Sequence, residues 1–318
     1  MKRKIQSGET VACLPKSKGK ILKNLFKYKY LYLMLIPGII HYIVFRYVPL
    51  AGILIAFQDF NLFDGIMGSD FVGMKHFIEI FSSDEIWKLI RNTLLLGTYS
   101  LLFNLPIPIL FAIVLNEIKF TPFKKLTQSI SYFPSLISTV VVASMVIDFL
   151  SPSTGIVNVL IEKLGFEKHY FMADPKCFRT IYVISEVWQK FGYNAVMYLS
   201  AIIGISSELY EAAEIDGCSR LKRIWHVTLP GLLPTICTLT ILNAGHIFKI
   251  GADRALLLYN PLTYETADIF GTFVYRRGVL ESNYSYSAAA GLFESVVAFI
   301  VVVTTNKLSK KVSETSLW

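Results

Sequence analysis

Ionisable and amide side chains interrupt a long apolar segment in the C-terminal half of the chain. Glu186 and Lys190 are four residues apart, with Gln189 between them and Asn194 following. Residues four apart share one face of a helix, so this carboxylate and this ammonium can form an ion pair. Charged groups within a membrane span usually face a watery cavity or the interior of a helix bundle. Glu186, Gln189 and Asn194 are therefore candidate residues of a solute pathway.

A second apolar segment carries polar residues at spacings of three and four: Asn243, His246, Lys249 and Asp253. On one helix they form a stripe that needs a polar or wet neighbour along its length. As a group, the stripe is the stronger candidate for a solute pathway. Taken singly, Glu186–Lys190 and Lys249–Asp253 are better explained as structural ion pairs. Lys190, Lys249 and Arg254 favour an acidic solute, unless Glu186 and Asp253 neutralise them.

Motifs of catalysis are missing from this sequence. It contains no Gly-x-x-x-x-Gly-Lys-Ser/Thr phosphate loop, no His-Glu-x-x-His and no serine nucleophile elbow. Its four cysteines, at positions 13, 177, 218 and 237, have neither paired nor metal-ligand spacing. We therefore expect a protein that is not an enzyme and that uses no cofactor or metal.

The composition indicates which elements must position these polar groups. Of the 318 residues, 53% are hydrophobic and only 17% are charged, and the mean hydropathy is +0.51. A soluble protein usually has about a quarter of its residues charged. Several apolar runs approach the roughly 20 residues that cross a bilayer as a helix. The chain is therefore predicted to be an all-α integral membrane protein.

Six membrane-spanning helices are predicted, at about 30–56, 92–115, 130–149, 181–203, 235–258 and 288–305. A basic tail at 1–29 precedes a transmembrane domain at 30–306, which includes a loop at 207–234, and a short tail at 307–318 follows. Lysines are concentrated before the first span, and Arg220, Lys222 and Arg223 lie in the loop between the fourth and fifth spans. This bias places both termini in the cytoplasm. It also argues against nucleic-acid binding as the reason for the net charge of +8.

The loop between the fourth and fifth spans has the pattern of a helical hairpin. Ser207 is a plausible N-cap for a first short helix. Gly217 permits the left-handed conformation that ends a helix. A second amphipathic helix then follows, and Pro230 is expected to stop it before the fifth span. By pattern alone, this hairpin packs beneath the bundle as an ordinary connector.

The segment Glu211–Pro230 resembles the EAA loop of ABC-importer permeases. Glu-Ala-Ala at 211–213 is followed by three residues, Gly217, nine residues and Val227-Thr228-Leu229-Pro230. Val227 is the one departure, because the family usually has isoleucine there. Residues 45–49, 55–59, 91–94, 259–265 and 306–318 are similar to complex-sugar permeases of the maltose-type family, in its lipoprotein- and polysaccharide-transport branch.

This resemblance implies the transmembrane domain of a six-helix type I ABC importer in a bacterial plasma membrane. Its partners would be cytoplasmic ATPase subunits, a second and different permease chain, and an extracytoplasmic substrate-binding protein. The cargo would be a carbohydrate, with an oligosaccharide favoured. The residues that couple to the ATPase would be Glu211, which makes a charged contact, Ala212 and Ala213, Gly217 at the turn, and Leu229 and Pro230, which hold the second helix.

Three alternatives remain open at this point. The same machine can carry a different solute, such as a peptide-like or phosphorylated compound. A secondary transporter driven by an ion gradient would show inverted repeats, and the sequence shows no internal repeat. A structural or sensory subunit that never transports would leave the spacing of the EAA loop without a purpose.

Overall fold

A computed structural model describes residues 27–244, residue 247 and residues 251–313, with side chains described as far as residue 310. The predicted tails before residue 27 and after residue 313, together with His246 and Lys249, lie outside the described residues. The chain divides into two units, Met1–Ile53 and Leu54–Trp318, and each is described by itself.

The first unit contains most of the first predicted span. Helix α2 covers Lys29–Tyr42, and a π-helical turn at Ile43–Tyr47 leads into a 3₁₀ helix at Val48–Phe57 that extends into the second unit. Together they form an apolar helical segment of 29 residues. Pro49 has no N–H to donate, which fits the change of helix type around it. The apolar side chains of α2 are exposed, as expected of a surface that faces lipid.

The second unit begins with a small surface element. Strand β1 (Gln58–Asp59) pairs antiparallel with β2 (Asp70–Phe71), and the short helix α3 (Gly65–Gly68) lies between them. Helix α4 (Lys75–Ser82) follows and buries His76, Phe77 and Ile80. This amphipathic helix therefore packs one face against the protein.

The second predicted span is longer than expected, and the third is broken. Helices α5 (Asp84–Asn104) and α6 (Pro106–Glu117) form a segment of 34 residues. Helix α7 (Thr121–Tyr132), with the 3₁₀ turn Phe133–Leu136, is bent by 96° from α8 (Thr139–Phe149). A straight third span is therefore wrong. Ser138 caps α8 by accepting a hydrogen bond from the Val141 N–H, so a new helix starts where the chain turns.

Helix α10 (Pro175–Ile203) is the element around which the second unit is built. It contains 29 residues and contacts α5, α6, α7, α8, α13 and α14. A loop with α9 (Ile156–Lys163) and a 3₁₀ turn at Phe171–Ala173 precedes it. Two buried apolar clusters pack against α10, one around Tyr182 and Leu96 and the other around Tyr198 and Leu232.

The fifth predicted span is shifted toward the N-terminus. A helical segment of 25 residues at Arg220–Ala244 joins α12 (Arg220–Arg223), a π-helical turn at Ile224–Thr228 and α13 (Leu229–Ala244). Residues 252–258 form the separate helix α14 (Ala252–Leu258). The expected single helix at 235–258 is therefore wrong, and Asn243 and Asp253 belong to different helices.

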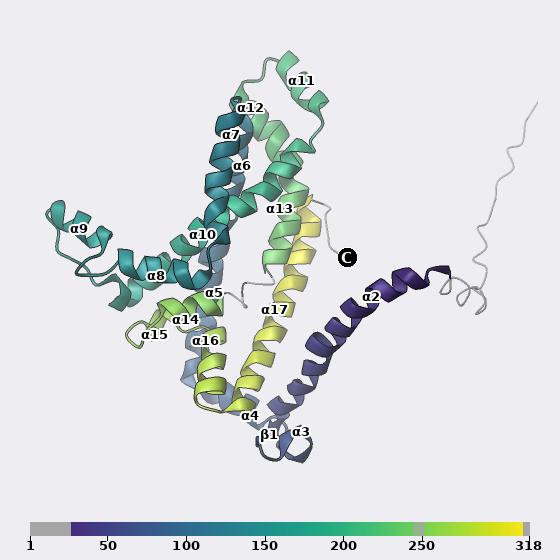
Figure 1. Cartoon of the computed structure of the whole chain (residues 1–318), viewed down its shortest axis with the longest axis vertical. Coiled ribbons are helices and arrows are strands. Elements are labelled where there is room, and N and C mark those ends of the chain that lie inside the picture. Colours follow the sequence, from purple (N-terminus) through teal and green to yellow (C-terminus); the bar gives the residue numbers. More distant parts are fainter. Residues whose placement is uncertain (1–26, 245–246, 248–250, 314–318) are drawn as a thin grey trace, which may run out of the picture. The chain divides into compact units, whose positions relative to one another are not determined.

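The loop before the last span is folded. It contains α15 (Tyr264–Ala267), α16 (Phe270–Tyr275) and a π-helical turn at Arg276–Leu280. The final helix, α17 (Tyr284–Ser313), lies beside α13, as Figure 1 shows. Buried side chains of α4, α5, α16 and α17, among them Ile80, Ile86, Phe270 and Ala289, form a third apolar cluster.

Four helical segments of the described chain are long and apolar enough to cross a membrane, or five if the bent pair α7–α8 is one span. Helix α10 has the required length, but Glu186, Gln189 and Lys190 lower its hydropathy. The predicted count of six spans therefore depends on α10 and on the bent pair. These are the two places where polar groups or a break interrupt the apolar pattern.

Candidate functional site

The hairpin between α10 and α13 is built from local signals. Helix α11 (Ser207–Ile215) begins at Ser206, whose side chain accepts a hydrogen bond of 3.2 Å from the Glu208 N–H. Ser206 is thus the N-cap, in place of the expected Ser207. At the other end, Gly217 has a φ of +72°, as predicted for the turn.

A complete Schellman motif ends α11. The Cys218 N–H donates to the Ala213 carbonyl at 2.9 Å, and the Gly217 N–H donates to the Glu214 carbonyl at 3.0 Å. These bonds satisfy carbonyl groups that a helix end leaves unpaired. Because a residue with a Cβ is disfavoured in the left-handed region, glycine fits this position best.

Pro230 does not stop the second helix of the hairpin. The chain remains helical from α12 into α13, and Pro230 is the second residue of α13. The π-helical turn at Ile224–Thr228 immediately precedes it. Because a π-turn changes the register of the backbone hydrogen bonds, the helix can continue although Pro230 has no N–H to donate. The hairpin is therefore continuous with the span that follows it.

One side of the hairpin exposes apolar groups beside a carboxylate. The exposed fractions are 55% for Leu209, 87% for Ile215, 78% for Leu221 and 69% for Trp225. Glu211 is exposed too, and it has no ion pair among the described residues, whereas Glu214 pairs with Arg223 at 3.4 Å. Exposed apolar residues gathered on so small an element are typical of a docking surface. Figure 1 shows this hairpin, with α11 and α12, at one end of the unit.

The opposite side of the hairpin is anchored in the protein. The Tyr210 hydroxyl lies 3.0 Å from Thr228 Oγ1, and Thr228 is buried. Ile224 and Leu229 pack against the apolar cluster of α6, α10 and α13, whereas Pro230 is exposed. Of the predicted coupling residues, Glu211, Ala212, Gly217 and Pro230 are thus exposed, and Ala213 and Leu229 are half-buried.

Glu186 is the centre of a buried polar cluster. Its Oε1 accepts a bond of 2.8 Å from Lys190 Nζ, which confirms the expected pairing within the helix. Its Oε2 accepts bonds from the Ser100 hydroxyl and, at 3.1 Å, from Asn104 Nδ2. Both of these donors lie on α5, so a carboxylate on α10 is held by two helices. A buried carboxylate with several donors can remain ionised.

Arg254 joins the cluster from α14; the sequence pointed to it as a cation that favours an acidic solute, but not as one of the pathway residues. It is buried, and it donates to Ser185 Oγ at 2.9 Å and to Gln189 Oε1. Its guanidinium carbon also lies 6.0 Å from the centre of the Tyr182 ring. The sequence signal for Arg254 was a charged residue within an apolar run.

The described polar residues surround a cavity of about 410 Å³. Its polar lining consists of Ser100, Asn104, Glu186, Lys190, Asn194 and Asn243. The structure therefore brings together Glu186, Asn194 and Asn243 from the predicted pathway. Gln189 does not line the cavity: its Nε2 donates to the Ile137 carbonyl at 2.7 Å, and its Oε1 accepts from Arg254. Asp253 is exposed on the separate helix α14. A stripe along one helix from Asn243 to Asp253 is thus wrong.

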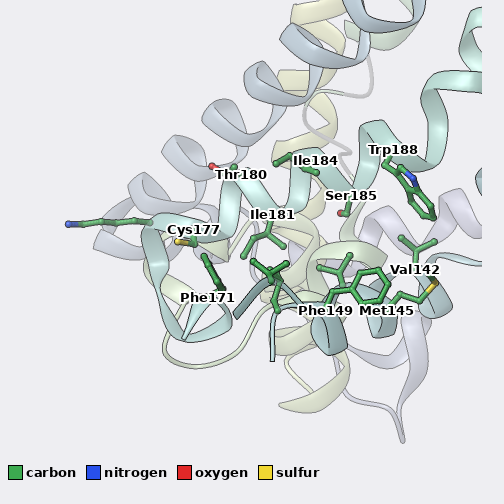
Figure 2. A pocket seen from close by; sticks show the side chains of 14 residues that line it. Val142, Met145, Phe149, Phe171, Cys177, Thr180, Ile181, Ile184, Ser185 and Trp188 are labelled. Carbon is green, nitrogen blue, oxygen red and sulfur yellow. The ribbon is translucent and has the colours of Figure 1, made fainter. Parts of the chain in front are cut away.

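A second cavity of about 520 Å³ is almost entirely apolar. Side chains from α8, α9 and α10 line it, together with Phe171. Figure 2 shows Trp188 at one end of this cavity, near Val142 and Met145. Trp188 also borders a neighbouring cavity of about 740 Å³ along α10, which Arg179 and Phe191 help to line.

Hydrogen bonds between distant segments join the start of α5 to the loop that contains α15 and α16. Asn92 Nδ2 donates to the carbonyls of Glu265, at 2.9 Å, and Asp268, at 3.1 Å. Arg276 binds the Asp268 carboxylate with both terminal nitrogens, at 2.5 and 3.1 Å. Burial alone would lower the pKa of the Arg276 guanidinium, but its bonds to Asp268 outweigh this and raise it. The segments 91–94 and 259–265 are thus parts of this hydrogen-bonded region, joined by the bond from Asn92 to the Glu265 carbonyl.

Comparisons with known proteins agree with this architecture. Residues 105–314 match the family model described as "Binding-protein-dependent transport system inner membrane component". The chain is 40% identical over 299 residues to the polygalacturonan/rhamnogalacturonan transport system permease protein YteP of Bacillus subtilis, covering 94% of this chain and 93% of YteP. It is 38% identical over 290 residues to Protein LplB of the same organism, covering 91% of each chain.

A solved structure is similar over nearly the whole chain. It is the bacterial alginate ABC transporter in complex with a periplasmic protein that carries an alginate pentasaccharide. The matched chain has a TM-score of 0.87 and 39% sequence identity, covering 94% of this chain and 100% of the other. The helices described above thus form a known all-helical membrane permease fold.

Proposed function

Because the chain belongs to the family of binding-protein-dependent transport system inner membrane components, we propose that it carries an oligosaccharide with carboxylate groups through the cavity beside Glu186. It is a permease subunit of an ABC importer for carbohydrate, and ATP is hydrolysed on a separate subunit. The full-length similarity to YteP and to the alginate transporter supports the choice of an acidic cargo.

Charge in the polar cluster supports this cargo independently. The cluster contains one carboxylate, Glu186, against two cations, Lys190 and Arg254. Lys190 pairs with Glu186, whereas Arg254 donates hydrogen bonds to the neutral groups of Ser185 and Gln189. The side chain of Lys190 is 52% exposed and borders the cavity. Glu186 and Lys190 line the cavity and balance each other, whereas Arg254 lies behind its wall, so the cluster as a whole carries a net positive charge that would attract carboxylates.

Coupling to the ATPase is assigned to the hairpin between α10 and α13. Glu211 and the exposed apolar residues of α11 and α12 would contact the ATPase subunit. The continuous helix from Arg220 to Ala244 would carry the movement into the bundle without a hinge at Pro230. This continuity is the observation on which the coupling proposal rests. Ala212, Ala213 and Gly217 would let the two subunits approach closely, and Leu229 would anchor the hairpin in the core.

The remaining partners follow from the same proposal. The hairpin would lie in the cytoplasm, with both termini on that side, because Arg220, Lys222 and Arg223 place a basic cluster there. The folded outer loops would face the substrate-binding protein. A second and different permease chain would complete the pathway.

The test is ATPase activity of the reconstituted importer with and without its binding protein. We expect binding protein loaded with an oligogalacturonate to stimulate the native complex more than the same protein offered a neutral oligosaccharide of equal length. Glu211→Ala should lose the stimulation. Glu208→Ala is the matched control, because Glu208 is also exposed on α11 but lies one turn earlier. Equal coupling in both variants would contradict the assignment of Glu211, and equal stimulation by both sugars would contradict an acidic cargo.

A further inference from the structure

Three side chains capable of binding a metal converge in the outer loop before α10. His169 Nε2 lies 3.1 Å from Asp174 Oδ2 and 3.7 Å from Cys177 Sγ, and that sulfur lies 3.5 Å from Asp174 Oδ2. The spacing of the cysteines gave no sign of such a site, because Cys177 has no second cysteine near it. The loop brings in a histidine and an aspartate instead.

These distances match the edges of a tetrahedral zinc site. Zinc binds nitrogen and oxygen at about 2.0 Å and thiolate sulfur at about 2.3 Å, so tetrahedral angles place the ligand atoms about 3.3–3.5 Å apart. The three measured separations of 3.1, 3.5 and 3.7 Å bracket that range. Mixed nitrogen, oxygen and sulfur ligands favour Zn²⁺ over Mg²⁺ or Ca²⁺, which prefer oxygen alone.

Two of the three ligands, His169 and Asp174, are held by a second group, as in functional metal sites. The side chain of Asn158, which is fully buried, binds the His169 backbone, accepting from its N–H at 2.9 Å and donating to its carbonyl at 3.0 Å. Asp174 Oδ1 accepts the Lys176 N–H at 2.8 Å as the N-cap of α10, which leaves Oδ2 for a metal. The His169 ring packs edge-on against Phe171.

We propose that His169, Asp174 and Cys177 bind a zinc-class divalent cation, with water in the fourth position. The His169 side chain is 47% exposed, so solvent reaches the site. Binding releases the thiol proton of Cys177, and the carboxylate and thiolate together neutralise the two charges of the ion. The metal would tie the loop after α9 to the first turn of α10. It would thereby hold Phe171 and Cys177, which both line the apolar cavity of Figure 2.

The test is protection of the Cys177 thiol in the detergent-solubilised importer complex. The parent variant retains Cys177 alone and carries Cys13→Ser, Cys218→Ser and Cys237→Ser. Its reaction with a maleimide is timed in the presence and absence of zinc chloride. At free Zn²⁺ ten times above the dissociation constant, the rate should fall about tenfold, because only the unbound fraction reacts.

Two variants of the parent and one control decide the outcome. Asp174→Asn retains an N-cap residue, and His169→Gln retains a polar side chain, yet each should abolish protection, measured for each variant as the ratio of its own labelling rates without and with zinc. A variant that retains only Cys218, which is also half-buried, should show no protection. An unprotected parent, or protection that survives both substitutions, would overturn the proposal.

A second measurement uses the wild-type complex, so it does not depend on the variants. Co²⁺ should produce a thiolate-to-metal charge-transfer absorption band that added Zn²⁺ displaces and that Cys177→Ser removes. A band that persists in Cys177→Ser, or no band at all, would overturn the proposal. Neither result depends on the identity of the transported solute, so the metal site and the transport function are tested separately.

Discussion

The Tyr210 hydroxyl and Thr228 Oγ1 lie 3.0 Å apart and join the two halves of the hairpin between α10 and α13. Tyr210 belongs to α11, and Thr228 is the last residue of the π-helical turn before α13. Thr228 is buried, so this bond connects the exposed hairpin to the base of the span. A displacement of α11 by the ATPase would reach α13 directly through this pair.

Removing this hydrogen bond should weaken both the hairpin and the coupling. We expect Tyr210→Phe to lower the free energy of unfolding by about 1 kcal/mol, the usual net value of such a bond. Thermal denaturation of the detergent-solubilised complex would measure it. Thr228→Val should have a similar effect. In the double variant the losses should be less than additive, and full additivity would mean that the two hydroxyls act independently.

Gly217 is expected to tolerate substitution poorly for a reason of backbone conformation alone. A Cβ at this position would meet no atom within 4 Å, but its φ of +72° disfavours any residue with a Cβ. Gly217→Ala should therefore lower the free energy of unfolding by about 1–2 kcal/mol and reduce stimulation of the ATPase. Gly204→Ala is the control, because Gly204 has a φ of −77°. Equal losses of thermal stability in both variants would contradict this explanation.

Gly192 allows α10 to cross α7 at close range. A Cβ at Gly192 would overlap the Ser131 carbonyl, whereas a Cβ at Gly291 on α17 would just touch Val274, at 4.0 Å. Glycine at such crossings lets membrane helices approach each other closely. Gly192→Ala should lower the free energy of unfolding by about 1–3 kcal/mol, because the backbone must move to make room for the methyl group. Gly291→Ala should be nearly neutral. Comparing the yield of assembled, monodisperse complex from the two variants tests this difference.

Lys190 should matter both for the charge of the cargo and for stability. Its side chain is half-exposed, but Glu186 is buried and keeps only the bonds from Ser100 and Asn104 when Lys190 is replaced, so the variant should lower the free energy of unfolding by roughly 1–3 kcal/mol. Lys190→Gln should reduce uptake of an oligogalacturonate several-fold and leave uptake of a neutral oligosaccharide nearly unchanged. The control is Lys168→Gln, because Lys168 also pairs with a glutamate, at 3.1 Å, but lies outside the cavity. A parallel loss for both sugars would indicate a structural role for Lys190.

Local relationships were accessible from the sequence because they depend only on helical spacing and residue conformation. The pairing of Glu186 with Lys190 requires no more than four residues on one helix. The turn at Gly217 follows from the Glu-Ala-Ala spacing and from the freedom of glycine to adopt a positive φ. The membrane class follows from composition, since apolar runs of this length have no other stable environment.

Tertiary structure alone decided where helices bend and which distant groups meet. Pro230 looks like a stop signal, but the helix continues through a π-helical turn into α13, and α7 and α8 are bent by 96° where the apolar pattern predicted one helix. Arg254 and Gln189 are 65 residues apart, and Ser100 and Glu186 are 86 apart. Spacing along one helix cannot predict such contacts, because they are set by how whole helices pack against each other.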